Sequence, residues 1–468
     1  MPTCGECHLM LPEIVTSIPG PRSLELASLL SKYENRNVTF IGPNFPVFLE
    51  RASGANVWDV DDNRFLDLTG GFAVAAHGHT HSSIRAALVD QSAKLLHAMG
   101  DVHPGENKAL LCRRLSQITF ERWGLGNGKT TLGNSGFEAV EVAIKTSLLH
   151  SGKPGVIAFT GGYHGLGYGA LEVMGIRWFR EPFQQHLRDF TTWLPYPHCY
   201  RCPFGRQEGY RLDGSRFPNC ASSCLEAIED QIVLAIRQRP IGCMVVEPCQ
   251  GRGGEVVPPL DFLRMLRQVC DTYKILLIFD EIYTGFNRTG TLFASDQFGV
   301  YPDLICLGKG LTTGFPLSAC VGRAEIMDAW PRSAGEALHT TTFLGNPIGC
   351  AIALASIDLH LDSTVGKRVQ ALGKHFRARL KALAAPEIGH IRGLGLMIGA
   401  EIVQKDGSPN SKLASQMVLS ALKDGLLFLG GGLDGNVLSF TPPFCIETEE
   451  IDYTCNKIFN YLRLGSVS

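Results

Sequence analysis

The chain has 468 residues, of which 45% are hydrophobic and 19% are charged, and its formal net charge at pH 7 is −2. These values are typical of a globular protein whose length allows two domains. Because there is no basic excess and no apolar run of the ~18 residues that a membrane span needs, we expect neither nucleic acid nor a membrane as a partner.

The cysteines and glycines also bear on location and fold. The N-terminal stretch lacks a charged region followed by an apolar core, so we expect no secretory leader. Fifteen cysteines without such a leader favour reduced thiols in the cytoplasm, with metal ligation as the main exception. The 52 glycines exceed the usual share of ~7%, which indicates many tight turns and close approaches of the backbone to a ligand.

The N-terminal part is predicted to begin with a short helix and to continue as a small sheet. A helix is expected from Pro21, because proline is tolerated in a first helical turn. Residues 47–68 alternate apolar and polar side chains between turn formers, which predicts an antiparallel meander. From Ser82 onward the pattern becomes helical. We therefore expect residues 1–75 to form part of a smaller domain.

The middle of the chain alternates predicted strands and helices from about residue 131 to 322, which favours a mainly parallel sheet covered on both faces. The candidate strands are Val156–Phe159, Ile241–Val246, Ile275–Asp280, Leu304–Leu307 and Leu317–Val321. We expect a large domain over residues 76–335. A C-terminal α+β domain over 336–468 would contain a helix at 346–360 and a glycine-rich strand region at 391–403.

Lys309 directly follows one of these apolar strands and is bracketed by Gly308 and Gly310. Burying an unpaired ammonium group is costly, and a Schiff base with a carbonyl cofactor removes that charge. The flanking glycines leave room for a planar ligand. The alternative is a lysine that reaches solvent from the end of its strand.

Asp280 ends another apolar strand, where a carboxylate is costly unless it is paired. Such a carboxylate can hold a pyridine nitrogen in its protonated, electron-withdrawing form. Tyr283, three residues later, could reach the same ligand. The alternative is an aspartate that caps the next turn.

Two further stretches suit a planar, phosphorylated ligand. A helix is expected to start at Ser135-Gly136-Phe137, and helix N-termini bind anions. Tyr163 and His164 lie in a glycine-rich turn after a strand, where an aromatic ring can lie against a planar ligand. An ordinary helix cap and a tyrosine that packs on the surface are the alternatives.

Five motifs together resemble the class III pyridoxal-phosphate-dependent aminotransferases, the ω-aminotransferase group. They are Asn-Ser-Gly-x-Glu-Ala from Asn134, Gly-Gly-Tyr-His-Gly from Gly161, Asp-Glu-x-x-Thr-Gly-Phe-x-Arg-Thr-Gly from Asp280, Leu-Gly-Lys-Gly from Leu307 and Thr-Phe-x-Gly-Asn-Pro from Thr342. The resemblance implies the α/β architecture of fold type I. In it, a large domain has a mainly parallel seven-stranded sheet flanked by helices, and both chain ends form a smaller α+β domain. It also implies a homodimer with shared active sites.

The resemblance implies the cofactor pyridoxal 5′-phosphate and a role for each matching residue. Lys309 would form the aldimine and later move the proton, and Asp280 would contact the ring nitrogen. The implied cofactor contacts are Ser135, Gly136, Phe137, Tyr163, His164, Asp280, Tyr283, Lys309 and, from the neighbouring subunit, Thr342. Glu247 matches the substrate-side glutamate of the family. The implied reaction moves an amino group from an amino acid or ω-amine to a keto acid by ping-pong kinetics.

Three positions depart from the family pattern. Tyr283 replaces a more common glutamine, and its phenol can donate the same hydrogen bond. Leu166 and Ser439 stand where relatives commonly have arginines that bind substrate carboxylates, and losing such a clamp is not conservative. Arg252 and Arg288 are the nearest alternative carboxylate binders.

These replacements leave the amino donor and acceptor open. They also keep two alternatives to a transaminase: an amino-acid racemase or epimerase on the same scaffold, and a catalytically inactive relative that binds the cofactor.

Four cysteines form a separate pattern in an insertion at about 197–225. Cys199, Cys202, Cys220 and Cys224 have the spacing Cys-x2-Cys-x17-Cys-x3-Cys, which resembles a four-cysteine zinc site. The alternative is four reduced thiols in an irregular loop.

Overall fold

The chain packs as two compact units in a computed structural model that describes residues 9–204 and 220–465. One unit combines Met1–His81 with Arg368–Ser468, and the other is Ser82–Lys367. The first unit is thus built from both chain ends. The domain boundaries expected near residues 75 and 335 stay a prediction.

The first unit contains two four-stranded sheets. One has the order β1-β2-β3-β13, with β1 (Leu49–Ser53), β2 (Asn56–Asp59), β3 (Arg64–Asp67) and β13 (Leu426–Leu427). The other has the order β11-β12-β15-β14, with β11 (Ile388–Leu394), β12 (Met397–Ile402), β14 (Leu429–Gly431) and β15 (Val437–Phe440). Strands β1, β2 and β3 pair antiparallel, which confirms the predicted meander.

Helices accompany these sheets in the first unit. They are α1 (Pro21–Tyr33), α2 (Gly70–Ala73), α14 (Ser411–Lys423), α15 (Thr448–Gly465) and most of α13 (Ser363–Ala382). The helix predicted to begin at Pro21 is confirmed as α1, with the proline in its first turn.

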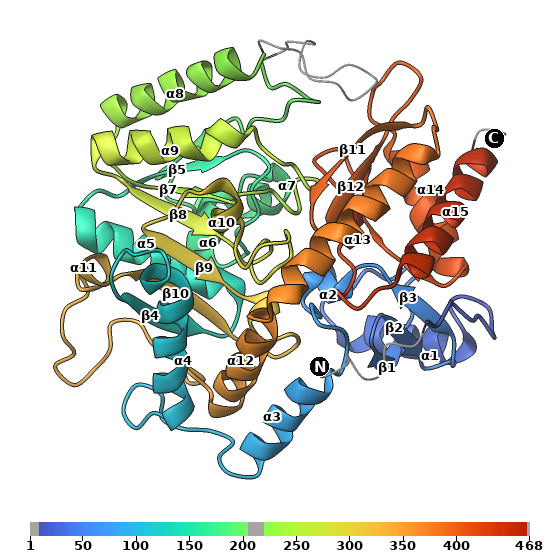
Figure 1. Ribbon diagram of the computed structural model, residues 1–468, viewed down its shortest axis with the longest axis horizontal. Helices are drawn as coiled ribbons and strands as arrows, with labels where there is room; N and C mark the ends of the chain where they lie inside the picture. Colours follow the sequence, from blue (N-terminus) through green and yellow to red (C-terminus); the bar gives the residue numbers. More distant parts are fainter. Residues whose placement is uncertain (1–8, 205–219, 466–468) are drawn as a thin grey trace. The chain divides into compact units, whose positions relative to one another are not determined.

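The second unit is organised around a seven-stranded sheet of order β4-β10-β9-β8-β7-β5-β6 (Figure 1). Its strands are β4 (Gly128–Gly133), β5 (Gly155–Phe159), β6 (Thr191–Leu194), β7 (Ile241–Val246), β8 (Leu276–Asp280), β9 (Leu304–Leu307) and β10 (Ser318–Arg323). Only β10 runs antiparallel to its neighbours, so the predicted mainly parallel seven-stranded sheet is confirmed. Strands β4 and β6 were not among the predicted strands.

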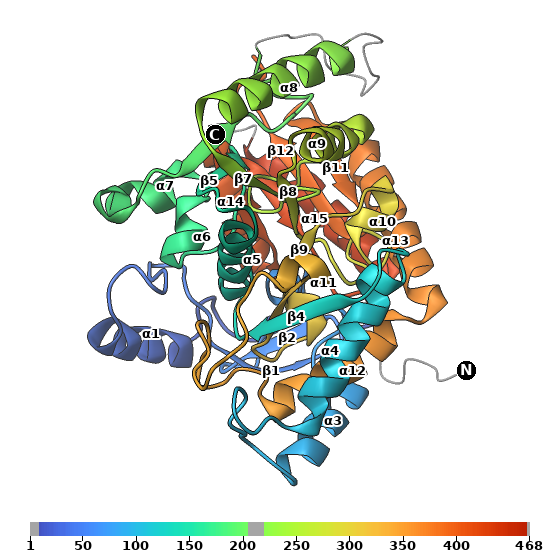
Figure 2. The same ribbon diagram turned by 90° about the vertical axis from the view of Figure 1, so that its left-hand side faces the viewer.

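Helices and short turns connect these strands. They are α3 (Ser82–Ser92), α4 (Glu106–Ser116), η1 (Gln117–Glu121), α5 (Gly136–Ser151), α6 (Tyr168–Glu172), α7 (Arg177–Arg180), η2 (Glu181–His186), α8 (Cys220–Gln238), α9 (Leu260–Tyr273), α10 (Ala294–Phe298), η3 (Lys309–Leu311), α11 (Ala324–Met327) and α12 (Pro347–His360). Helices α8 and α9 lie side by side, and α5 packs along the sheet (Figures 1 and 2).

The sheet of the second unit is buried on both faces. In β9, Ile305 and Leu307 pack into a core cluster that includes residues of α4 and α12. The alternate residues Leu304 and Cys306 pack into a second cluster that includes residues of α5. Because successive side chains of a strand point to opposite faces, this packing explains why the strand reads as a continuous apolar run.

One edge of the sheet collects the segments that carry the predicted site residues. Strands β4, β5, β7, β8 and β9 run in the same direction, so the segments that follow them leave the sheet at the same edge. Ligands of open α/β sheets bind at the carboxyl ends of the strands.

Within the described parts of the chain, we find no single helix with the length and hydropathy of a membrane span. Helices α12 and α13 pass that test only when they are taken together as a sharply bent pair.

Candidate active site

Lys309 lies in a tight turn immediately after β9. Its φ is +42°, and the amides of Thr312 and Thr313 both donate to its carbonyl at 3.2 Å. Its Nζ lies 4.8 Å from the centre of the Tyr283 ring. Burial lowers the pKa of Lys309, while the negative charges of Asp280 and Glu247 oppose that shift. The side chain is therefore an amine that loses its proton more readily than an exposed lysine.

Asp280 is paired with a buried histidine at the end of β8. Its Oδ2 lies 2.8 Å from His164 Nδ1, and its Oδ1 accepts a hydrogen bond from the Ile282 amide at 3.1 Å. Burial of His164 disfavours its protonation, but the hydrogen bond and charge of Asp280 outweigh that effect and raise the pKa of His164. The sequence placed both residues in the cofactor site but did not predict that they bind each other.

Glu247 is a second buried carboxyl group beside this pair. It follows β7, and its two oxygens accept hydrogen bonds from the amides of Tyr163 at 2.8 Å and Gly251 at 3.0 Å. Burial raises the pKa of Glu247 to about 7, while the charge of His164 opposes this and that of Asp280 adds to it. Glu247 therefore exchanges a proton near neutral pH.

Tyr196 supports the segment that contains Glu247, and its role was not predicted. Its hydroxyl lies 3.1 Å from the carbonyl oxygen of Glu247 and 3.2 Å from that of Pro248. A buried phenol that donates to these carbonyls holds the segment in place. No motif of the sequence indicated this contact, because Tyr196 lies 51 residues before Glu247.

The start of α5 lies against the turn that carries Tyr163. Ser135 is the N-cap of this 16-residue helix, as predicted from the sequence, and its amide donates to the Glu138 carboxylate at 2.9 Å. Gly165 has a φ of +106°, and a Cβ atom there would lie 2.3 Å from Phe137 Cβ. Only a glycine fits this approach. The helix start and the Tyr163 turn therefore belong to one site.

Two aromatic rings border this site. Tyr163 is partly buried and packs edge-on against Phe179, with the ring centres 5.6 Å apart. Tyr283 is also partly buried, and a Cβ atom on Gly251 would lie 3.0 Å from its ring. Tyr283 therefore lies between Lys309 and the segment after Glu247.

The remaining predicted residues differ in exposure. Thr342 and Arg252 are exposed, and Leu166 exposes 52% of its surface. Arg288 exposes only 1%, which favours a structural role over a contact with substrate. Ser439 lies on β15 of the first unit and pairs in register with Gly399 and Leu429.

The predicted metal ligands lie partly outside the described residues. Cys199 and Cys202 are partly buried and Cys224 is buried, while the side chain of Cys220 is not described. Over the side chains that the structure describes, no group of three or more His, Cys, Asp or Glu residues is arranged to hold a metal ion.

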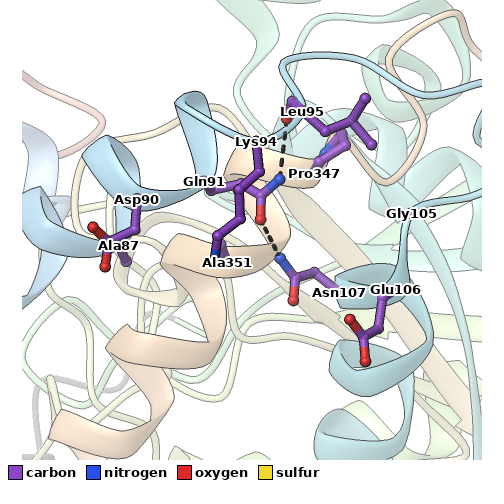
Figure 3. Close-up of a pocket in the computed structure, with 10 residues that line it drawn as sticks. All are labelled: Ala87, Asp90, Gln91, Lys94, Leu95, Gly105, Glu106, Asn107, Pro347 and Ala351. Atoms are coloured by element: carbon purple, nitrogen blue, oxygen red, sulfur yellow. Dashed lines mark hydrogen bonds between the residues drawn. The ribbon is translucent and has the colours of Figure 1, made fainter.

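A separate cavity of about 380 Å³ lies between α3, α4 and the start of α12 (Figure 3). Its lining residues are Ala87, Asp90, Gln91, Lys94, Leu95, Gly105, Glu106, Asn107, Pro347 and Ala351. The Gln91 amide donates to the Leu95 carbonyl at 3.1 Å and accepts from the Asn107 amide at 2.8 Å. None of the predicted cofactor residues lines this cavity.

The sequence of this chain is similar to that of a known protein family. The model of the aminotransferase class-III family matches residues 40–462. An alanine/serine racemase of Pyrococcus horikoshii is 33% identical over 94% of this chain and 90% of that protein. A 4-aminobutyrate aminotransferase of Mycobacterium leprae is 35% identical over 93% of this chain and 95% of that protein.

A solved structure extends the likeness to the fold. The amine transaminase from an uncultivated Pseudomonas species, in its form with bound pyridoxal phosphate, matches with a TM-score of 0.81 and 28% identity. The match covers 92% of this chain and 97% of that one.

The donor set around Lys309 fits pyridoxal phosphate. Lys309 would supply a primary amine for the aldehyde, and Asp280 would supply a carboxylate for the ring nitrogen. The start of α5 supplies helix amides for the phosphate. These groups come from adjoining segments at one edge of the sheet.

Proposed function

The chain belongs to the class III aminotransferases, and we propose that Lys309 and Asp280 carry its pyridoxal-phosphate-dependent transamination. The reaction moves an amino group from an amino acid or an ω-amine to a keto acid in two half-reactions. The observation that carries the assignment to these residues is their arrangement. A lysine of lowered pKa and a carboxylate bonded to a buried histidine lie at the ends of neighbouring parallel strands.

Lys309 acts first as the group that holds the cofactor and then as the base that moves a proton at the substrate carbon. Its lowered pKa makes the neutral, nucleophilic amine more accessible near pH 7. The turn after β9 holds its backbone, so that the flexible side chain is the part that moves.

Asp280 and His164 are the residues that would hold the ring nitrogen of the cofactor. Pyridoxal phosphate, when bound, serves as an electron sink for the substrate carbon, and its power depends on a protonated ring nitrogen. Asp280 would accept a hydrogen bond from this protonated nitrogen, and His164 orients Asp280 through its bond to Oδ2. The pair is buried, so water does not compete for this contact.

Phosphate binding and assembly complete the proposal. Gly136 and Phe137 offer the first amides of α5 to the phosphate, beside the N-cap residue Ser135, whose own amide is bonded to Glu138. Thr342 is exposed, which suits its proposed role as a phosphate contact for a second subunit in a homodimer. Exposed Phe343 next to it adds apolar surface of the kind that subunit interfaces bury.

The absence of two carboxylate-binding arginines guides our proposal for the substrates. Leu166 and Ser439 stand where relatives commonly have arginines that bind substrate carboxylates. We therefore propose that neither half-reaction depends on a substrate carboxylate bound at these two positions. Exposed Arg252 and the Glu247 carboxyl group are the proposed polar contacts. A screen of amino donors against keto-acid acceptors should show turnover without a marked preference for dicarboxylic acceptors.

Replacing the lysine tests the core of the assignment. Lys309→Ala should reduce turnover to background, because it removes both the attachment point and the base. Borohydride treatment and mass spectrometry should find cofactor attached to the wild-type protein and none attached to the variant. Lys129→Ala, which removes an exposed lysine, is the matched control and should keep both properties. Normal turnover by Lys309→Ala would rule out the assignment.

A racemase is the second candidate function, favoured by the similarity to the Pyrococcus horikoshii alanine/serine racemase. It would use the same proton removal by Lys309 but return the proton to the same carbon. Inversion needs no keto acid. Chiral analysis of an amino-acid panel without an acceptor therefore separates the two: inversion identifies a racemase, and turnover only with an acceptor identifies a transaminase.

Zinc binding and location are proposed from the cysteines. The spacing of Cys199, Cys202, Cys220 and Cys224 supports a zinc site. Metal analysis of the purified chain and of a Cys199→Ser, Cys202→Ser variant tests it, and equal zinc contents in the two would contradict it. The chain has fifteen cysteines, and so many thiols suit a reducing compartment, which supports the proposed cytoplasmic location.

A further inference from the structure

The carbonyl of Gly310, next to Lys309, is held from α12 by two buried side chains. Ser356 Oγ donates to this oxygen at 2.9 Å, and His360 Nε2 lies 3.0 Å from it. Ser356 and His360 are four residues apart and therefore lie on the same face of the helix. Ser356 exposes none of its surface and His360 only 3%.

The contacts determine which nitrogen of His360 carries the proton. A carbonyl oxygen has no hydrogen to give, so Nε2 must be the donor to Gly310. The other ring nitrogen, Nδ1, then accepts from the Asn287 amide at 3.3 Å, and Asn287 also donates to the His360 carbonyl at 2.8 Å. Burial lowers the pKa of His360 to about 3, so the ring stays neutral and keeps both roles.

His360 thereby connects two backbone segments with unusual conformations. Lys309 has a φ of +42°, and Phe286 and Asn287, in the segment after Asp280, have φ values of +55° and +63°. Left-handed conformations of such residues are costly and persist when surrounding contacts enforce them. The two segments also touch directly, because a Cβ atom on Gly310 would lie 3.0 Å from Phe286 Cβ.

We propose that His360, assisted by Ser356, is a positioning residue that holds the Lys309 turn in its reactive conformation and ties it to the segment after Asp280. The inference rests on the proposed role of Lys309. Without the two donors, the Gly310 carbonyl would be a buried acceptor that lacks these hydrogen bonds. The free-energy cost of that loss would favour a rearrangement of the turn. A small displacement of the lysine amine is enough to slow its reactions.

The test measures how fast Lys309 captures the cofactor, separately from turnover. Cofactor-free protein is mixed with pyridoxal 5′-phosphate, trapped with borohydride at set times and examined by mass spectrometry. His360→Phe keeps an aromatic ring against Phe286 but removes both hydrogen bonds of the imidazole. We expect capture and kcat to fall about tenfold, with KM within about twofold of the wild type.

A conservative variant and a control separate positioning from simple destabilisation. His360→Gln retains an amide donor near Nε2 and should recover most of the capture rate. Thr119→Val removes another buried hydrogen bond to a carbonyl, 2.6 Å long, from η1 to Leu115. It should lower Tm and leave capture unchanged.

The capture rates of these variants decide whether His360 positions the Lys309 turn. Wild-type capture and kcat in His360→Phe would overturn it, as would an equal slowing in Thr119→Val. If His360→Phe does not fold, Ser356→Ala decides: about threefold slower capture supports the proposal, and the wild-type rate overturns it. Failure of the wild-type protein to capture cofactor at Lys309 would instead contradict the proposed function.

Discussion

Two buried carboxyl groups at neighbouring strand ends behave differently, although they lie in the same site. Asp280 ends β8 and has an imidazole partner 2.8 Å away, whose pKa it raises. Glu247 follows β7 and is held by two backbone amides, and burial raises its pKa to about 7. Amides bind a carboxylate but carry no full charge, so they offset less of the cost of burying an anion.

This comparison suggests that Asp280 and Glu247 have different roles. A carboxyl group that is bonded to an imidazole is held in a fixed orientation, which suits the contact with the cofactor's ring nitrogen that we propose for Asp280. A carboxyl group that titrates near pH 7 can gain or lose a proton when a charged substrate enters or leaves. The nature of the partner, rather than burial itself, distinguishes the two groups.

Removing the charge at Asp280 should have the largest effect. Asp280→Asn keeps the shape but takes away the anion that we propose faces the cofactor's ring nitrogen, so we expect kcat to fall on the order of a thousandfold. Asp303→Asn is the matched control, since Asp303 is also buried but bonds to Arg267 and to the Leu277 amide. The control should lower Tm and keep kcat within about twofold. A kcat of Asp280→Asn within tenfold of the wild type would contradict the role of the charge.

Removing the partner of Asp280 should have an intermediate effect. His164→Phe keeps a ring but leaves the buried carboxylate without its imidazole, and kcat should fall between about tenfold and a hundredfold. The pKa of His164 is raised, so its stabilising contribution is complete below pH 6.5, its unfolded value, and is lost as pH rises through the folded value.

The stability difference between wild type and His164→Phe gives an independent check. Urea unfolding of both proteins should show that this difference shrinks as the pH is raised above 6.5. A difference that does not vary with pH would mean that His164 is not charged by Asp280.

Replacing Glu247 should have the smallest effect on turnover but a distinct effect on stability. Its pKa rises from 4.5 to about 7 on folding, so the folded chain keeps a proton that the unfolded chain releases between these values. Wild-type stability should therefore fall across this range, relative to Glu247→Gln, by up to about 3 kcal/mol. The change in kcat should stay within about threefold.

Urea unfolding of wild type and Glu247→Gln at pH 5 and pH 8 checks this expectation. Parallel changes in the two proteins would show that Glu247 does not titrate differently in the folded state, and the contrast with Asp280 would then fail.

The elements of the large sheet could be read from the sequence where local patterns were strong. The apolar runs that became β7 and β9 were predicted with their observed bounds, and the helix start at Ser135 was predicted correctly. Strands β4 and β6 were missed because their burial is mixed, as in Gly128–Gly133, where exposed and buried positions do not follow a clear run.

The sequence by itself determined the chemical groups of the site and their places at strand ends. A continuous apolar strand ends close to the first polar residue, as it does at Asp280 and just before Lys309, and this tendency acts over a few residues. The tertiary structure decided which groups meet. His164 and Asp280 lie 116 residues apart, Tyr163 and Glu247 84, and Gly310 and His360 50. Hydrogen bonds act over about 3 Å, so strand order and helix packing, rather than local pattern, set these partners and the pKa values that follow from them.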